Sequence, residues 1–527
     1  MDDAAYKEIK ATLRSLDRRA ATIEAAVEKL KEELQSNRAE RQRLVDLLTP
    51  INDLPSETLA DIWDYTRECH KHPRVGGENW SHGACRWRFK IAPSVLKMSW
   101  VSRRWRGVAL TSPLLWSDLV VSPHTSLELA RMKVERSQSC PLTIIVNFAN
   151  YCDDEDIHDS DASVAHFLSL MEVIQPHVAR WRTLEFIGCF GIMEMSGHVT
   201  SINGPAGKTI VDACTGILAT TPATQLMNIR VQYDSDLPVE LPEFMRGGLP
   251  ALRRATVHGM DVRSCLPALT SLTSLDLRIP SGQRPTPTQL RDFILACPDL
   301  STLSLHGPPM EYFLDPPEDY NYPIITAPAV RSLRIAFNID EEHLGYYFFK
   351  AFSLPNVETL RIHDSTQEQL DLFALQLREI DFTGRIDRFP KLRKFSSHYN
   401  RFSPDSARLM LQYMPTITDL EMDHFDMPQV TRYLLEYASS QGQVRACCPL
   451  VKLKTLTWNN ATNEPVATEA VLRYVVAERI TCGFPIAKLR VDRGFLQLHA
   501  DVQRWYRERI DVEVVPWIPQ DEAGYFI

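Results

Sequence analysis

The 527-residue sequence lacks the features that mark secreted and membrane-spanning proteins. No uninterrupted apolar stretch reaches the length needed to cross a bilayer. The first residues do not combine a basic head with an apolar run, so we expect no secretory signal. The 11 cysteines are odd in number and follow no repeated spacing, which is typical of reduced thiols. These absences predict a cytoplasmic or nuclear protein.

Excess positive charge and the common catalytic motifs are also absent. The net charge of -9 argues against a surface devoted to a polyanion. The sequence contains no Gly-x-Ser-x-Gly elbow, no His-Glu-x-x-His and no Gly-x-Gly-x-x-Gly. We therefore expect no enzyme and no bound cofactor. The hydrophobic fraction of 44% is ordinary for a globular protein, and the length is sufficient for two to four domains.

The N-terminal segment is expected to form one long helix, because residues 4–49 contain no Gly and no Pro. Its apolar residues recur in alternating steps of four and three, which is the heptad pattern of a coiled coil. This seam consists of Ile9, Leu13, Leu16, Ala20, Ile23, Val27, Leu30, Leu34, Leu44 and Leu48, with polar members at Asn37 and Arg41. Two interpretations remain open: the helix folds back on its own chain, or it joins a second copy in a coiled coil.

Two apolar segments follow, the first over residues 53–63. Pro55 suits a first helical turn, which needs no amide donor at that position. In the second segment, residues 98–116, Val101 and Trp105 recur at helical spacing, and Pro113 ends the helix. Six of the ten tryptophans lie between positions 63 and 116. Aromatic residues at this density indicate a compact core or a contact surface.

These segments resemble an F-box, in the variant common among fungal F-box-like proteins. The matching pattern is Leu-Pro-x-Glu-x-Leu-x-x-Ile-aromatic in the first segment, then Ser-x-Val-x-Arg-Arg-Trp-Arg and Pro-x-Leu-Trp in the second. The resemblance implies a small all-α module that docks on a Skp-family adaptor and, through it, on a cullin–RING ubiquitin ligase. The residues implied to bind the adaptor or to form the core of the module are Leu54, Pro55, Leu59, Ile62, Trp63, Val101, Trp105, Leu114 and Trp116.

The insert between the two segments, residues 66–97, is basic. Residues 67–106 contain ten Lys or Arg but only two acidic residues. Cys85–Lys90 alternates cations with aromatics, as single-stranded nucleic-acid binders do. We expect a solvated loop, with nucleic-acid binding as an alternative. We assign no metal, but whether zinc binds to the insert stays open for the candidate ligands Cys69, His70, His72, His82 and Cys85.

From about residue 180 onward one phrase recurs: an apolar residue, two others, Leu or a substitute, one other, and a second apolar residue. It occurs at Trp181–Phe186, Leu226–Val231, Leu272–Leu277, Leu300–Leu305, Val330–Ile335, Val357–Ile362, Leu377–Phe382, Ile417–Met422 and Leu453–Trp458. The alternation predicts a short strand at each phrase. Helical runs such as 288–295 and 407–413 lie between the phrases. Repetition every 20 to 30 residues is typical of a solenoid.

This repetition resembles leucine-rich repeats, which implies parallel strands stacked into a curved sheet with helices outside. We expect an α/β fold with four parts. These are a heptad helix at 1–49, an F-box-like module at 50–122, an irregular leucine-rich-repeat-like solenoid at 123–515 with its N-terminal cap at 123–180, and a tail at 516–527. The alternative is an ordinary α/β domain with parallel strands.

Together these features lead us to expect a substrate-recognition subunit of an SCF-type cullin–RING ubiquitin ligase. Its F-box would dock on the Skp-family adaptor, and its solenoid would bind an unidentified target protein. One alternative is a self-associating scaffold, joined through residues 4–48, that does not dock on the ligase. Another is nucleic-acid binding through the insert. We expect no membrane partner.

Overall fold

The computed structural model describes residues 3–48, 54–71, 95–122, 125–147, 160–187, 221–232, 249–258, 270–279, 284–311, 324–336, 348, 351–363, 365–381, 389–398, 400, 402–423, 430, 450, 452–459, 465–491, 495–496 and 498–515. The chain forms two compact units, which divide between Leu115 and Trp116. The helical unit comprises the described residues up to Leu115, and the sheet unit comprises those from Trp116 onward. Among the described residues, no helix has both the length and the apolar character that a bilayer span requires.

The helical unit begins with the long helix α1, Asp3–Leu48, as the sequence predicts. It continues with α2 (Ser56–Lys71), α3 (Val95–Ser99), α4 (Arg103–Thr111) and the 3₁₀ turn η2 (Pro113–Trp116), whose last residue belongs to the sheet unit. Ser102 caps α4, because its hydroxyl accepts a hydrogen bond from the Trp105 amide at 3.2 Å. Helix α4 packs against both α2 and α3. The two predicted helical segments therefore fold together, although about 35 residues separate them.

The sheet unit contains a 14-stranded, entirely parallel sheet in which the strands follow one another in chain order. The strands are β1 (Asp118–Val121), β2 (Leu142–Asn147), β3 (Trp181–Ile187), β4 (Asn228–Gln232), β5 (Arg254–His258), β6 (Ser274–Arg278), β7 (Thr302–His306), β9 (Ser332–Ala336), β11 (Thr359–His363), β12 (Lys394–His398), β13 (Asp419–Asp423), β14 (Thr455–Asn459), β15 (Lys488–Val491) and β16 (Asp511–Val514). A separate parallel pair joins β8 (Ile325–Thr326) to β10 (Phe352–Ser353).

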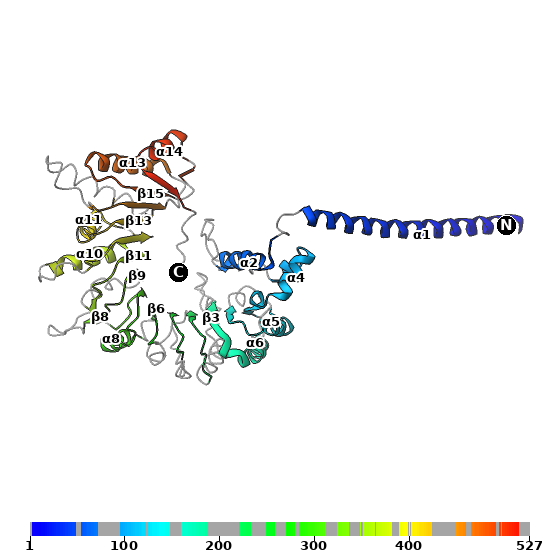
Figure 1. The fold of residues 1–527 in the computed structure, drawn as a ribbon, viewed down its shortest axis with the longest axis horizontal. Helices are drawn as coiled ribbons and strands as arrows, with labels where there is room; N and C mark the ends of the chain where they lie inside the picture. Colours follow the sequence, from blue (N-terminus) through cyan, green and yellow to red (C-terminus); the bar gives the residue numbers. More distant parts are fainter. Residues whose placement is uncertain are drawn as a thin grey trace. The chain divides into compact units, whose positions relative to one another are not determined.

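Helices lie on one side of this sheet, and the strands follow an arc inside them (Figure 1). The helices are α5 (Leu127–Arg136), α6 (Ser160–Ile174) followed by the 3₁₀ turn η4 (Gln175–Arg180), α8 (Pro287–Leu295), α10 (Gln367–Asp381), α11 (Pro404–Gln412), α13 (Pro465–Thr481) and α14 (Ala500–Arg507). A capping box at Thr286 and Gln289 starts α8, and Ser403 caps α11. Pro287 and Pro404 occupy the first helical turns, where no amide donor is needed.

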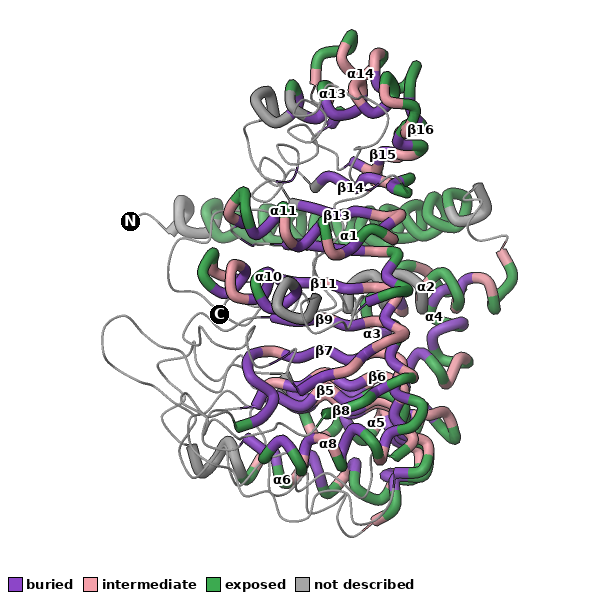
Figure 2. Tube along the Cα trace, turned by 90° about the vertical axis from the view of Figure 1, so that its left-hand side faces the viewer, coloured by how far each residue is buried: buried purple, intermediate pink, exposed green. Residues whose placement is uncertain are grey.

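The Leu position of each phrase and the apolar residue two places after it form the core of the sheet unit. Leu275, Leu303 and Leu333 stand in register on β6, β7 and β9 and are completely buried, as are most such positions (Figure 2). Side chains alternate across a strand, so in β4 to β14 of this sheet the first, third and fifth residues of each strand point to the opposite side. We call this opposite side the polar face. Most added strands bury two more apolar side chains, which is how a one-directional stack gains stability. In β12 the two buried positions hold Phe395 and Ser397.

One predicted strand is wrong. Leu377–Phe382 overlaps the end of α10, which runs to Asp381. In α10 four residues are buried at helical spacing: Leu370, Phe373, Ala374 and Leu377. The next strand is instead β12, with Phe395 at the Leu position.

The sequence phrases also missed strands. β5 carries Ala255 where the phrase has Leu, and β12 carries Phe395. β15, although it fits the phrase at Ile486, Leu489 and Val491, was not recognised either. The first strand β1 lies inside the range predicted for the helical module, so the sheet starts at Asp118 and continues through the predicted cap. The predicted tail, 516–527, lies outside the described residues.

Candidate functional site

The residues predicted to bind an adaptor separate into buried and exposed groups. Leu59 and Trp105 are buried and form the core between α2 and α4. Leu54 and Trp63 are half-buried. The exposed group consists of Pro55, Ile62, Val101 and Leu114. Buried side chains stabilise the unit itself, so the exposed group contains the candidate contact residues for another protein.

Trp116 belongs to the sheet unit rather than to the helical unit. Its indole is buried, and the guanidinium of Arg136 lies 4.7 Å from the ring centroid. Such cation–π contacts stabilise a fold by about 0.5–2 kcal/mol. Trp116 therefore stabilises the start of the sheet unit.

Two arginines of the second segment hold the helical unit together. Arg104 donates a hydrogen bond to the Leu54 carbonyl, and Arg106 Nε donates to the Ser99 carbonyl at 3.0 Å. These bonds join α4 to the start of α2 and to the end of α3. Two further apolar side chains, Trp100 and Leu110, are exposed, with 73% of the Trp100 surface accessible. The sequence pattern did not single them out, because both lie between the residues of the apolar face.

The apolar seam of α1 is uncovered along its described length. Its Ile, Leu and Val members from Ile9 to Leu44 are between 44% and 63% exposed. The interpretation that α1 folds back on its own chain finds no covering helix among the described residues. Ion pairs on the helix surface, such as Lys31 to Glu28 at 3.0 Å, lie between residues three apart and leave the seam apolar.

None of the side chains of the candidate zinc ligands is among the described ones. Cys69 and His70 fall within α2, but their side chains are not among the described ones. His72, His82 and Cys85 lie outside the described residues, as does the basic stretch Cys85–Lys90.

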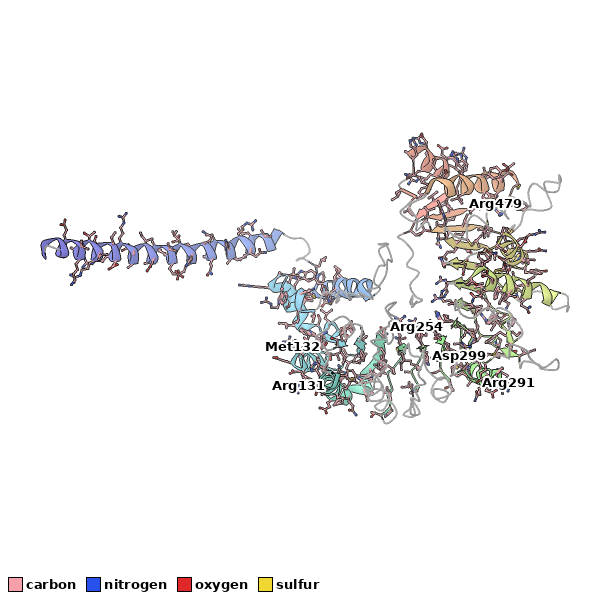
Figure 3. All side chains as sticks on the ribbon, turned by 180° about the vertical axis from the view of Figure 1, so that it is seen from behind. Arg131, Met132, Arg254, Arg291, Asp299 and Arg479 are labelled. Carbon is pink, nitrogen blue, oxygen red and sulfur yellow. The ribbon has the colours of Figure 1, made fainter. Side chains whose placement is uncertain are left out.

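The polar face of the sheet unit carries ordered rows of charged and polar side chains. On β4 to β11 the described strand residues of this face include one acid, Asp276, and the five arginines Arg230, Arg254, Arg278, Arg334 and Arg361. Arg254 lies on the strand side of the unit, whereas Arg291 lies on the helix side (Figure 3). The centre of the polar face is therefore basic, although the whole chain is acidic.

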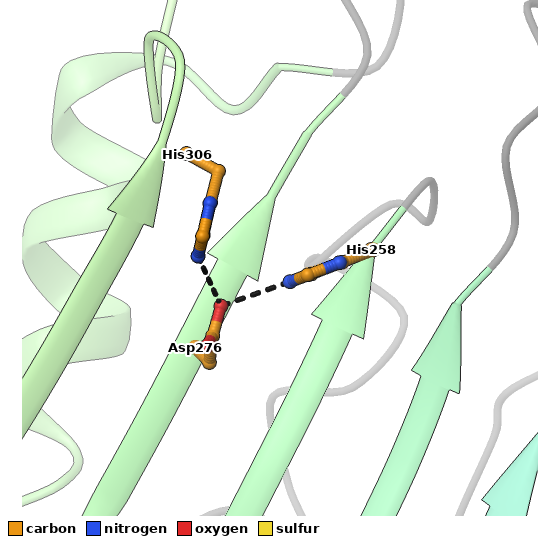
Figure 4. A group of neighbouring side chains, drawn as sticks. All are labelled: His258, Asp276 and His306. Carbon is orange, nitrogen blue, oxygen red and sulfur yellow. Dashed lines mark hydrogen bonds and ion pairs between the residues drawn. The ribbon is translucent and has the colours of Figure 1, made fainter. Parts of the chain in front are cut away.

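Asp276 stands between two histidines on this face (Figure 4). His258 Nε2 donates a hydrogen bond to Asp276 Oδ1 at 2.9 Å, and His306 Nε2 lies 3.0 Å from the same oxygen. The imidazole rings of His258 and His306 are 5.0 Å apart, and that of His363 lies 5.6 Å beyond His306. Strands β5, β6 and β7 bring His258, Asp276 and His306 together, and His363 ends β11.

Burial and charge act in opposite directions on the pKa values of this cluster. Burial lowers the pKa of His258 below its usual 6.5, against the opposing effect of Asp276. Burial acts to raise the pKa of Asp276, but the hydrogen bond from His258 and the contact with His306 outweigh it, so this pKa lies well below its ordinary value. Near neutral pH the cluster holds an ionised carboxylate beside a neutral His258.

A second polar cluster connects β12 to β13. Glu421 is buried, its Oε2 lies 2.6 Å from Lys394 Nζ, and Ser396 Oγ donates to the same oxygen at 3.1 Å. His398 Nε2 lies 3.4 Å from Oε1. Burial acts to raise the pKa of Glu421, but the contacts from His398 and Lys394 outweigh it and hold this pKa well below its usual 4.5.

Sequence reasoning missed both clusters, although a usable signal was present. Asp276 and Glu421 each stand between the two apolar residues of a phrase, and His306 directly follows one. Stacking the phrases in register aligns these positions on neighbouring strands. His258 was out of reach, because β5 was not recognised as a strand.

Neither a protein-family model nor a curated protein sequence matches this chain.

The Glu421 cluster predicts an acid-dependent loss of stability. Because its pKa is lowered in the folded state, ionised Glu421 stabilises the fold above about pH 4.5, and this contribution is lost as the pH falls below that value. We expect Glu421→Gln to have a lower urea midpoint than the wild type at pH 7. The difference between the two midpoints should become smaller as the pH falls. Asp299→Asn, at an exposed position before β7, is the control and should change the midpoint little at either pH. An equal deficit for Glu421→Gln at pH 7 and pH 3.5 would contradict this role.

Proposed function

We propose that this protein is a substrate-recognition subunit of an SCF-type cullin–RING ubiquitin ligase. In this proposal the helical unit is an F-box-like module that docks on a Skp-family adaptor. The sheet unit is a leucine-rich-repeat-like solenoid that binds the target protein. The observation that carries the proposal is the folding of both motif segments into one packed set of helices, α2 to α4, with an apolar surface left outside.

A docking module must bury its own core and still present apolar side chains to its partner. Leu59 and Trp105 meet the first need, and Ile62, Val101 and Leu114 meet the second. Val101 is 61% exposed although it lies in a segment otherwise rich in core residues. Protein–protein contacts draw most of their free energy from a few such apolar and aromatic residues. The exposed set is therefore the proposed adaptor contact.

The sheet unit supports the solenoid interpretation through its strand order and through one buried asparagine. Asn400 follows β12 and donates hydrogen bonds to the Ile362 carbonyl at 2.9 Å and to Ser397 Oγ at 2.7 Å. It also accepts a bond from the Ser365 amide at 3.0 Å. It thus joins the repeat of β12 to two backbone groups of the preceding repeat, which resembles the role of an asparagine after a repeat strand. The five arginines of the polar face favour a target segment that carries acidic groups.

Adaptor binding tests the proposal directly. We expect the double variant Ile62→Asp, Val101→Asp to bind a purified Skp-family adaptor about 30-fold more weakly than the wild type, because two hot-spot contacts together contribute about 2 kcal/mol or more. Leu295→Asp is the control, since it makes the same kind of substitution at an apolar, 55% exposed position on α8 of the sheet unit. Unchanged affinity of the double variant, or no binding by the wild type, would overturn the proposed docking.

We also propose self-association through α1, with or without ligase docking. The supporting observation is the exposed heptad seam of a 46-residue helix. Isolated single helices gain little stability from such a seam unless a second helix covers it. Two copies of α1 would bury the seam of each against the other.

Light scattering of the full-length chain tests this association. Leu34 belongs to the seam, whereas its exposed neighbour Gln35 lies outside it. We expect Leu34→Asp to shift the mass from a multiple of the chain toward that of one chain, because it introduces charge into an apolar contact. Gln35→Asp adds the same charge outside the seam and should leave the mass unchanged. A wild type that is monomeric at micromolar concentration would rule out this association.

A further inference from the structure

Three side chains with metal-binding groups converge at one point on the polar face of the sheet unit. His258 ends β5, Asp276 lies in the middle of β6, and His306 ends β7 (Figure 4). Their potential ligand atoms all lie within 4.8 Å of one another. Because β6 lies between β5 and β7, the carboxylate stands between the two imidazoles.

Hydrogen bonds among the described residues leave this cluster incompletely satisfied. Asp276 Oδ1 accepts one hydrogen bond, from His258. His306 Nε2 is buried and lies 3.0 Å from the same oxygen, but it meets no hydrogen-bond geometry. A buried polar atom without a hydrogen bond costs free energy. An ion placed among the three groups would provide a partner for His306 Nε2 and for the carboxylate at once.

We propose that His258, Asp276 and His306 bind a divalent transition metal ion of the zinc class. Two imidazoles and one carboxylate are the ligand set of zinc sites that keep a fourth position open. Zinc lies about 2.0–2.2 Å from such ligands, so each histidine nitrogen, now 2.9 or 3.0 Å from Asp276 Oδ1, must move only about half an ångström from that oxygen. Each imidazole would bind through Nε2 and carry its proton on Nδ1. The fourth position would accept water or a donor atom from a bound partner.

The sheet fixes the geometry of this site. In the parallel register, Thr256 pairs with Asp276, and Asp276 pairs with Ser304. The two histidines stand one side-chain row further along, both in register with Arg278. The positive charge of Arg278 opposes a bound cation. We therefore expect Arg278→Gln to strengthen metal binding, which is a result that a purely hydrogen-bonded cluster would not give.

The experiment must separate this site from the candidate ligands in the insert. The background variant is the full-length chain carrying Cys69→Ser, His70→Gln, His72→Gln, His82→Gln and Cys85→Ser. Calorimetric titration with Zn²⁺ measures affinity and stoichiometry. The absorption spectrum with Co²⁺ identifies the ligands, because a thiolate ligand adds a charge-transfer band that nitrogen and oxygen ligands lack.

We expect the background variant to bind about one equivalent of metal without a thiolate band. Asp276→Asn and His306→Gln should each weaken binding about tenfold or more, since even the loss of outer contacts to a metal ligand costs 10–100-fold. Zn²⁺ should raise the melting temperature of the background variant more than that of Asp276→Asn. His499→Gln is the control and should leave affinity unchanged, because exposed His499 lies 3.5 Å from Asp501 and no third metal-binding side chain joins this pair in the described part of the chain.

Two results would overturn this inference. One is the absence of stoichiometric binding by the background variant. The other is binding that persists unchanged in Asp276→Asn and His306→Gln. Neither result bears on adaptor docking, which depends on the helical unit.

Discussion

In-register parallel pairing is the constraint on which the sheet unit depends. Most strands present two apolar side chains to the helix side, and a shift of one residue would turn them to the polar face. Leu275, Leu303, Leu333 and Leu360 stand in one buried row across four neighbouring strands. Because the core row is fixed, the residues between its members are fixed as well. The polar face is therefore a rigid array of side chains.

This rigidity explains why charged groups on the polar face form specific clusters. Lys394, Glu421 and His398 come from two strands, and His258, Asp276 and His306 come from three. No member of either cluster is adjacent in sequence to another member. Both acids are held ionised, although they are largely buried, by neighbours that the register supplies. A surface of this kind presents its groups without a large loss of conformational entropy on binding.

Local patterns predicted much of the fold because the phrase is also the unit of packing. The long helix was predicted from the absence of Gly and Pro, and eight strands of the 14-stranded sheet from the phrase. The prediction failed at Leu377–Phe382, where apolar residues fit both a strand and a helix and the preceding buried residues decided for the helix. It also failed at β5 and β12, where Ala255 and Phe395 replace Leu. The polar clusters could not be predicted, because they depend on which strands become neighbours.

The helical unit divides the motif residues into a buried and an exposed group, which is what the proposed docking requires. Leu59 and Trp105 hold the helices together, while Ile62 and Val101 remain at the surface. Hydrogen exchange of the full-length chain, with and without a Skp-family adaptor, tests this account most directly. The account predicts slower exchange in residues 54–63 and 98–115 when the adaptor is present, with exchange in the sheet strands unchanged. Protection confined to the sheet strands, or no protection at all, would contradict it.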